Sequence, residues 1–508
     1  MESIVLFLLL SIFVYFVINR TVTKITNTPP LLLWFALMIP SFIWLIWQLL
    51  NPGESNPPAL LIYVPLIISP IIYIWLIQKG KPKHKEEKEK KDSQPSQPLN
   101  FMTKQDSPDF NPDNLPFLSK KNVKRPINAE EEKALKDCFP WGVYYLQKID
   151  YLPQAIVCVG KLRTEPEKAY PTVKKNLERV FQDRFLVVFQ ETMQGKPFFA
   201  LVPNPYSEEN KSKQAPEKLT KPLTAIALLL LTLITTTIIG AEISGVTVEE
   251  LENNFSLVFQ GLPYSLCLLG ILGVHELSHY LFAVFHRIKT TLPYFIPLPF
   301  FLGTFGAFIS IKSPMPNRKA VFDVALAGPV GGFLVTIPVL VWGLIFSRVV
   351  PMAQNASMLD FSALDPRFSM IFAIISKIIF GSELGTGDAV ALHPAAVAGY
   401  IGLIVTALNL MPVGQLDGGH IVHAMFGQGK AVAIGQFARL LVILLAFIRP
   451  EFLLWAIILI FMPIADQPAL NDVTELDNTR DFLGLMSLLL LVFILLPVPP
   501  VIAQWMNL

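Results

Sequence analysis

Residues 262–285 read LPYSLCLLGILGVHELSHYLFAVF, an apolar run that is long enough to cross a bilayer as one helix. The run contains the pattern HExxH, with His275 and His279 four residues apart and Glu276 between them. Positions i and i+4 share one face of a helix, so the two imidazoles can bind one metal ion while Glu276 handles a proton. This arrangement is typical of zinc peptidases. Because ionisable groups are costly inside a membrane and usually mark a functional site, we favour a metal site over structural core histidines.

The composition indicates a mainly α, polytopic helical membrane protein with some soluble structure. The chain of 508 residues is 52% hydrophobic and only 16% charged. Its net charge of +2 gives no indication of a nucleic-acid partner, and none is expected. The three cysteines, Cys138, Cys158 and Cys267, lack CxxC spacing, so we expect free thiols rather than a zinc knuckle or a disulfide framework.

The amino-terminal part predicts a three-span membrane region over residues 1–78. Its apolar runs are Ile4–Asn19, which lacks signal-peptide features and is interpreted as a retained anchor, Leu31–Leu50 and Ala59–Gln78. At residue 79 the composition changes to KGKPKHKEEKEKKDSQPSQP, too charged to bury a core, so residues 79–127 are predicted to be a charged linker. The basic cluster beyond the third run predicts the cytosolic side of the membrane.

Residues 128–220 predict a small soluble α/β domain and a connector. Helical patterns begin at Ala129 and Pro166, QAIVCVGKL predicts a strand, and the stretch around MQGK at residues 193–196 predicts a hairpin. No nucleophile, phosphate loop or metal cluster stands in this segment. Substrate presentation, regulation and a purely structural scaffold therefore stay open as its role.

Residues 221–508 predict the membrane domain that carries the HExxH helix. Its other expected spans are Leu223–Gly240, Val321–Phe346, Ala395–Leu410, Lys430–Ile448, the short Phe452–Ile464 and Leu483–Val498, which gives about nine or ten spans in the whole chain. The run Met370–Phe380 is too short to span. Basic residues after the HExxH helix, at Arg287 and Lys289, predict that the metal site lies near the cytosolic end of that helix.

The stretch Thr291–Pro314 is apolar but interrupted by prolines and by Gly303 and Gly306, so it predicts a re-entrant extended segment beside the site rather than a span. An exposed strand there could pair with an unwound substrate, which makes Gly303 and Gly306 candidate substrate-binding residues. A passive re-entrant loop is the equal alternative. Farther along, the acids of PALNDVTELDNTRD, residues 468–481, predict either a guard at the cytosolic mouth or, as the favoured interpretation, a solvated loop.

A second motif, NLMPVGQLDGGH at residues 409–420, follows the expected span Ala395–Leu410 and should reach the depth of the HExxH. A catalytic zinc ion takes three protein ligands and keeps one position open for water. Asp417 is the favoured third ligand, and His420, with His423 behind it, is the alternative. One Zn²⁺ with Asp417 and a Glu276 carboxylate would be neutral overall, which lowers the cost of a buried site. Asn409 could hydrogen-bond the substrate backbone or satisfy a helix end.

These residues resemble the site-2 protease family of intramembrane zinc metalloproteases, and most closely its cyanobacterial and plastid branch. The resemblance covers about Asn128 to Leu508 and rests on HELSH, TLPYFIPLP, GTFGAF, FDVALAGPVGGF and NLMPVGQLDGG. It implies zinc bound by His275, His279 and Asp417, with Glu276 catalytic. Three features depart from the family. Gly160-Lys161-Leu162-Arg163 stands where the plastid proteins have GNLR, Ser278 stands in HELSH where HELGH is common, and the amino-terminal spans are additional.

The sequence therefore predicts an intramembrane zinc endopeptidase that cleaves a membrane-protein substrate in or near a transmembrane segment, close to the cytosolic face. The expected location is the lipid bilayer of a bacterial plasma membrane or a thylakoid. The alternative is an inactive protease-like scaffold or chaperone, or a transporter, although the paired internal repeats of transporters are not found. The substrate and the oligomeric state are left open by the sequence.

Overall fold

The structure is a computed structural model, and it divides into two compact units, Met1–Pro108 and Asp109–Leu508. The residues that it describes are 28–51, 127–152, 155–192, 195–205, 207, 221–299, 302–352, 360–448 and 452–508, with single residues at 11, 15, 65, 69, 72, 73, 76 and 79. The predicted span Leu31–Leu50 corresponds to helix α2 (Pro30–Leu50). The predicted spans Ile4–Asn19 and Ala59–Gln78 and the charged linker lie almost entirely outside the described residues.

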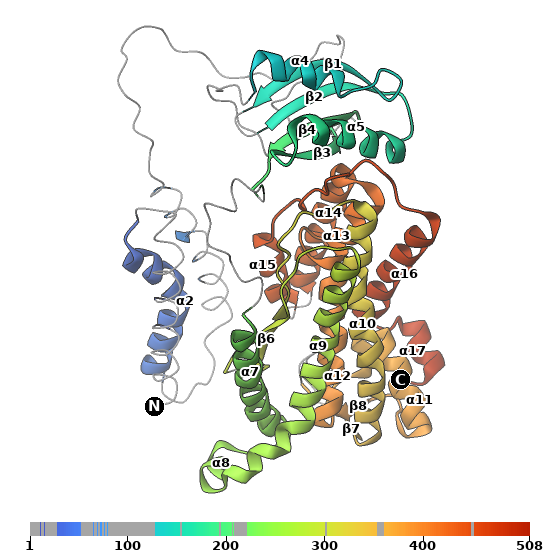
Figure 1. Ribbon diagram of the computed structural model, residues 1–508. Helices are drawn as coiled ribbons and strands as arrows, with labels where there is room; N and C mark the ends of the chain where they lie inside the picture. The colour runs from blue at the N-terminus through green and yellow to red at the C-terminus, as the bar shows by residue number, and fades with distance from the viewer. Residues whose placement is uncertain are drawn as a thin grey trace, which may run out of the picture. The chain divides into compact units, whose positions relative to one another are not determined.

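Residues 129–203 form an antiparallel four-stranded sheet with two helices (Figure 1). The elements are α4 (Ala129–Asp137), β1 (Tyr144–Leu152), β2 (Ala155–Leu162), α5 (Pro166–Phe181), β3 (Phe185–Glu191) and β4 (Pro197–Pro203), and the strand order is β1-β2-β4-β3. Helix α4 begins at a capping box, in which the side chains of Asn128 and Glu131 each accept a hydrogen bond from the other residue's backbone N–H. Strand β1 is an element that the sequence pattern did not predict.

Helix α5 covers the sheet because its apolar residues recur at helical spacing. Ala169, Tyr170, Val173, Leu177 and Phe181 are buried, which places them on one face toward the sheet. The Tyr170 hydroxyl donates a hydrogen bond to the Val187 carbonyl, so even the polar tip of this ring is satisfied. The α/β domain thus has a core of its own.

The remainder of the second unit is a bundle of apolar helices, which confirms the mainly α, polytopic fold. Six helical segments of the described residues are long and apolar enough to cross a membrane. One is in α2, which belongs to the first unit, and those of the second unit are α7 (Pro222–Ile243), η2 with α9 (Phe255–Gly261 and Leu262–Phe285), α10 (Arg318–Ile345), α14 (Gln428–Ile448) and α16 (Asn478–Leu495). Shorter elements are α8 (Val248–Asn253), α11 (Met370–Phe380), α13 (Asp417–Phe426), α15 (Leu453–Phe461), α17 (Pro500–Met506), β7 (Arg348–Pro351) and β8 (Asp388–Ala391).

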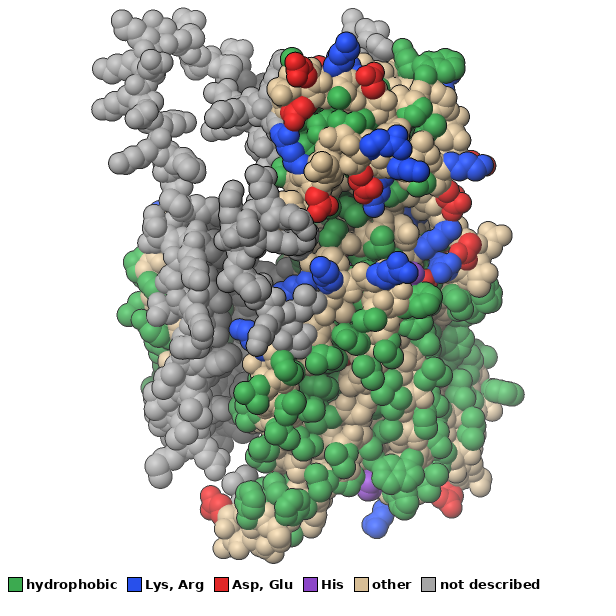
Figure 2. Space-filling model, in the orientation of Figure 1, with side chains coloured by type: hydrophobic (Ala, Val, Ile, Leu, Met, Phe, Trp, Pro, Cys, Tyr) green, Lys and Arg blue, Asp and Glu red, His purple; other side chains and the backbone are tan. Residues whose placement is uncertain are grey.

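Helix α12 (Pro394–Leu410) is buried along most of its length and has only 17 residues. It begins next to the β7–β8 ribbon, in which Arg348 pairs with Ala391, and its first turn is capped by the side chain of His393. His393 therefore lies at the opposite end of α12 from Asn409. Figure 2 shows hydrophobic side chains covering the bundle, with Lys and Arg side chains gathered where the bundle meets the α/β domain.

The extended segment expected at Thr291–Pro314 is a two-stranded antiparallel hairpin, β5 (Tyr294–Pro297) and β6 (Thr304–Phe308). Gly303 stands before β6 with φ +78°, a left-handed conformation that other residues rarely adopt. Its carbonyl accepts a hydrogen bond of 2.7 Å from the Thr235 hydroxyl on α7. The turn of the hairpin is therefore fixed to α7.

A segment from the end of the chain joins the α/β domain to the bundle; we call Asp466–Val473 the bridging segment. The backbone of Phe189 on β3 donates to the Leu470 carbonyl at 2.7 Å and accepts from the Asp472 N–H at 2.8 Å. The Leu470 N–H donates in turn to the Met315 carbonyl at 2.9 Å, and Val473 is only 4% exposed within the core of the α/β domain. The favoured expectation of a solvated loop at residues 468–481 is thus wrong for residues 471–474, which are buried because they continue the sheet edge.

Candidate metal centre

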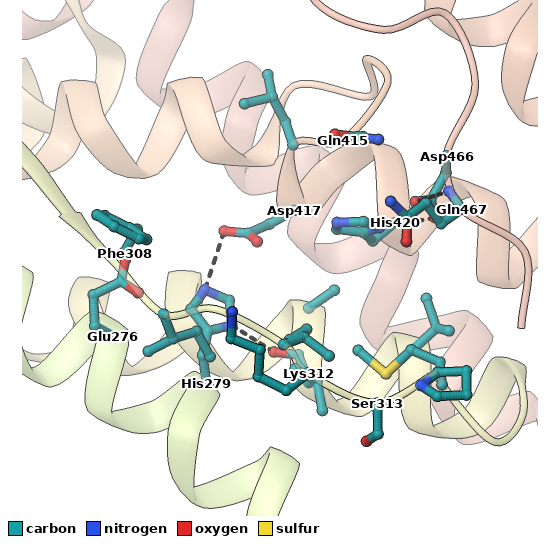
Figure 3. Close-up of a pocket in the computed structure, with 18 of the residues that line it drawn as sticks. Glu276, His279, Phe308, Lys312, Ser313, Gln415, Asp417, His420, Asp466 and Gln467 are labelled. Carbon is teal, nitrogen blue, oxygen red and sulfur yellow. Dashed lines mark hydrogen bonds and ion pairs between the residues drawn. The ribbon is translucent and has the colours of Figure 1, made fainter. Parts of the chain in front are cut away.

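His275 and His279 lie one turn apart on α9 and point to the same place, as their i, i+4 spacing predicts. Their Nε2 atoms are 3.2 Å apart, and Oδ2 of Asp417 lies 3.5 Å from the first and 3.4 Å from the second. A tetrahedron with metal–ligand bonds of 2.0–2.2 Å has edges of about 3.4 Å, so the three atoms fit three corners of a zinc site. Among the described residues this is the one group of His, Cys, Asp and Glu with such spacing. Figure 3 shows Asp417 directed at His279.

Helix α10 holds the second imidazole. Nδ1–H of His279 donates a 2.7 Å hydrogen bond to the Val324 carbonyl, which leaves the Nε2 lone pair free for a metal. One turn later, Gly328 approaches the same ring so closely that an added Cβ would stand 2.0 Å from Nε2. The stretch FDVALAGPVGGF therefore shapes the wall behind the candidate metal ligands.

Glu276 is buried on the other side of the centre, beside the hairpin. Its carboxylate faces the backbone N–H of Ile309, directly after β6, and Figure 3 shows it next to Phe308. The carboxylate shares one cavity with the candidate ligands. A group placed there can exchange a proton with a water molecule or a substrate bound between it and the metal.

The cavity has a volume of about 690 Å³ and reaches from the metal centre to the α/β domain. The lining residues from the hairpin and the following strand-like stretch include Ala307, Phe308, Ile309, Ile311 and Lys312; those from α13 and its flanks include Gln415, Leu416, Asp417 and His420; Leu186 and Pro205 come from the α/β domain. The cavity is thus lined both by Glu276 and by the extended backbone at the end of β6.

Asn409 and His420, the two other candidate residues of the second motif, lie in different surroundings. Nδ2 of Asn409 lies 3.2 Å from Nε2 of His275, and Asn409 lines the cavity. When that Nε2 binds a metal, the amide N–H is left to donate to another group at the centre. His420 instead directs Nδ1 to Asp466 at 2.8 Å, so the structure brings Asp417, and not His420, to the two histidines.

Gly303 and Gly306 are not among the residues that line the cavity. Gly303 is close to the backbone of Thr236 on α7, whereas Gly306 has φ +102° and open space at the position of a Cβ. The sequence prediction also missed the role of Asp466 and Asp472, which contact His423. The spacing of His420 and His423 on α13 is the one local signal that could have suggested buried acidic partners.

Comparison with known proteins agrees with this geometry. The model of peptidase family M50 matches residues 263–448, and the model of the EGY3 middle domain matches residues 133–210. A probable chloroplastic zinc metalloprotease, EGY1 of Arabidopsis thaliana, is 30% identical over 397 residues, which are 73% of this chain and 72% of the relative. EGY2 of the same plant is 28% identical over 365 residues, 71% of this chain and 63% of the relative.

No solved structure matches the chain. The matched family region contains both motifs that build the centre, and the similarity to EGY1 covers more of the chain than this region. The model of the EGY3 middle domain matches the α/β domain separately. The chain therefore belongs to the site-2 protease family of intramembrane zinc metalloproteases, peptidase family M50.

Proposed function

We propose that the chain binds one Zn²⁺ through His275, His279 and Asp417 and hydrolyses a peptide bond in or near a transmembrane segment of another membrane protein. The observation that carries this proposal is the triangle of ligand atoms with edges of 3.2, 3.4 and 3.5 Å. It opens into a cavity that also holds Glu276. A structural site would have four protein ligands, whereas three leave a position for reaction.

Zinc held by His275, His279 and Asp417 would acidify a bound water and polarise the carbonyl under attack. Glu276 shares the cavity with these residues, so it can accept a proton from an attacking water and donate it to the leaving amine. The Asn409 amide donates a hydrogen bond to the carbonyl oxygen as negative charge develops on it. Val324 keeps His279 in one tautomer throughout, because its carbonyl is 2.7 Å from Nδ1.

The hairpin presents the substrate in this proposal. A transmembrane helix hides its peptide bonds, so it must unwind before it reaches Glu276. Residues 307–309 follow an extended path along the cavity and offer backbone groups to an unwound segment. The fixed turn at Gly303 would hold this docking strand in register.

We also propose, from the positions of basic residues, which side of the membrane the metal centre faces. Exposed Arg287, Lys289 and Lys312 surround the end of the bundle that carries the centre and the α/β domain. By the positive-inside rule, these charges support a location of this end on the cytosolic side of a bacterial membrane or on the corresponding face of a thylakoid. Cleavage would occur near that face.

Membranes that contain the wild-type chain, Glu276→Gln or Glu252→Gln test this function. Glu252 lies on α8 and is exposed, which makes it the matched control. Protein fragments with new ends inside transmembrane segments should form with the wild type and the control, but not with Glu276→Gln, while all three purified proteins keep about one zinc per chain. Identical fragment patterns for wild type and Glu276→Gln, with zinc bound in both, would favour the inactive scaffold.

A further inference from the structure

We propose that the α/β domain helps to hold the metal centre in position, because the bridging segment connects this domain to α13, the helix that carries Asp417. Asp472 on the bridging segment and His423 on α13 are the positioning residues of this connection. The inference rests on the proposed function in one respect, since it takes Asp417 as the third ligand. It assigns the domain a role in holding the metal centre.

The first link is between the α/β domain and the bridging segment. Backbone hydrogen bonds of 2.7 and 2.8 Å pair Phe189 with Leu470 and Asp472, which closes the outer edge of β3. Val473 completes the hydrophobic core of the domain from outside its own sequence range. Movement of the domain therefore moves the bridging segment with it.

The second link is between the bridging segment and α13. His423 is fully buried, with Nδ1 at 2.6 Å from Asp466 Oδ2 and Nε2 at 3.0 Å from Asp472 Oδ2. Since both ring nitrogens face carboxylates, both carry hydrogen and the imidazolium joins two acids. The other oxygen of Asp472 is buried and has no hydrogen-bond partner in the described part of the chain. Asp472 therefore depends on His423 for its neutralisation.

The third link is α13 itself. The helix has ten residues; Asp417 is its first, and His420 and His423 follow at intervals of three. Its start is packed so tightly that a Cβ on Gly418 would stand 1.9 Å from the Leu410 carbonyl oxygen. A short, rigid helix held at His423 fixes the carboxylate at its other end. Loss of groups that orient metal ligands typically weakens metal affinity by about 10- to 100-fold.

Another contact between the α/β domain and the bundle provides a control. Lys319 on α10 forms an exposed 2.9 Å ion pair with Glu167 on α5, and among the described residues its side chain makes no hydrogen bond or ion pair with α13. Lys319→Ala therefore weakens docking without affecting the chain of contacts to Asp417. Glu475→Gln removes an exposed acid just after the bridging segment and controls for charge.

The experiment measures zinc affinity of the full-length, detergent-purified protein by competition with a chelator, and records the visible spectrum of the Co²⁺-substituted protein. We expect Asp472→Ala to weaken zinc binding by about 10-fold or more and to change the Co²⁺ spectrum, whereas Asp472→Asn, which can still accept from His423, restores most of both. Val473→Asp, which leaves every acid and imidazole in place, should weaken zinc binding similarly. The two controls should match the wild type.

Wild-type affinity and spectrum in Asp472→Ala would overturn the proposal, as would normal zinc binding in Val473→Asp once proteolysis shows that its α/β domain has detached. Should Asp472→Ala fail to fold, Asp472→Asn and Val473→Asp decide the question. Asp417→Ala separates the two hypotheses: zinc retained by this variant contradicts the proposed ligand set, whereas zinc lost there but held normally by Asp472→Ala contradicts only the role of the α/β domain.

Discussion

Replacing Gly328 by alanine should remove the metal from an otherwise intact protein. The added Cβ would stand 2.0 Å from Nε2, 2.4 Å from Cε1 and 2.5 Å from Cδ2 of His279. An ordinary contact between such atoms is about 3.5 Å, so the methyl group overlaps the ring by roughly 1.5 Å. The ring cannot turn aside and still bind a metal, because Nδ1–H donates a hydrogen bond to the Val324 carbonyl and Nε2 must face Asp417.

In Gly328→Ala, either α10 moves away from α9 or the His279 ring leaves the centre. Overpacking of this kind costs about 1–3 kcal/mol of stability. Loss of one of the three proposed ligands should lower the zinc affinity by more than 10-fold, on the order of what loss of an orienting group costs or more. Zinc per chain after dialysis against a chelator measures the effect, with the unfolding temperature as a check of the fold. Gly270→Ala on α9 is the control, since nothing lies within 4 Å of its Cβ position. A folded Gly328→Ala protein that binds zinc like the wild type would refute the reasoning.

Three further outcomes follow from the structure. Asn409→Ala should keep its zinc and lower kcat by about 100-fold, as loss of one oxyanion donor does, and an unchanged kcat in a cleavage assay would leave Asn409 as a helix-end residue. Burial alone lowers the pKa of His423, but its hydrogen bonds to Asp466 and Asp472 raise the pKa overall from 6.5 to about 9. Protonated His423 therefore stabilises the folded state fully below pH 6.5, and this contribution to stability is lost as pH rises through about 9. The unfolding temperature should fall across that window in the wild type and much less in His423→Gln. Gly303→Ala, which must hold φ +78° against the backbone of Thr236, should loosen the hairpin and reduce cleavage with zinc retained, whereas normal cleavage would show that the turn is not needed.

The HExxH helix and the bundle follow from patterns that the sequence displays locally. Apolar runs of sufficient length predict spans, and the i, i+4 spacing alone places His275 and His279 together. The choice between Asp417 and His420 needed the structure, because the two residues lie one helical turn apart and only the packing of α13 decides which faces α9. In the structure His420 is turned to Asp466, which leaves Asp417 to the histidines.

The bridging segment could not be found in this way. Asp466 and Asp472 are separated from His423 by 43 and 49 residues, and polar residues in a short stretch suggest a solvated loop. Asp472 is held at a strand edge by backbone pairing with Phe189, which no local pattern connects to residues 470–472. Strand β1 was missed for a related reason: its residues do not alternate regularly between buried and exposed, and its pairing with β2 is interrupted after Leu146.

The short length of α12 has a consequence for what happens after cleavage. Its 17 residues extend about 25 Å, less than the roughly 30 Å of a hydrocarbon core. A helix of this length that starts at one membrane surface ends about one helical turn before the other surface, and Asn409 lies at the end of α12 that is opposite the β7–β8 ribbon. In the proposed function, hydrolysis there would create an ammonium and a carboxylate inside an apolar layer, where charged groups are unfavourable. The new chain ends would therefore be driven toward water, which would separate the two fragments and oppose their religation.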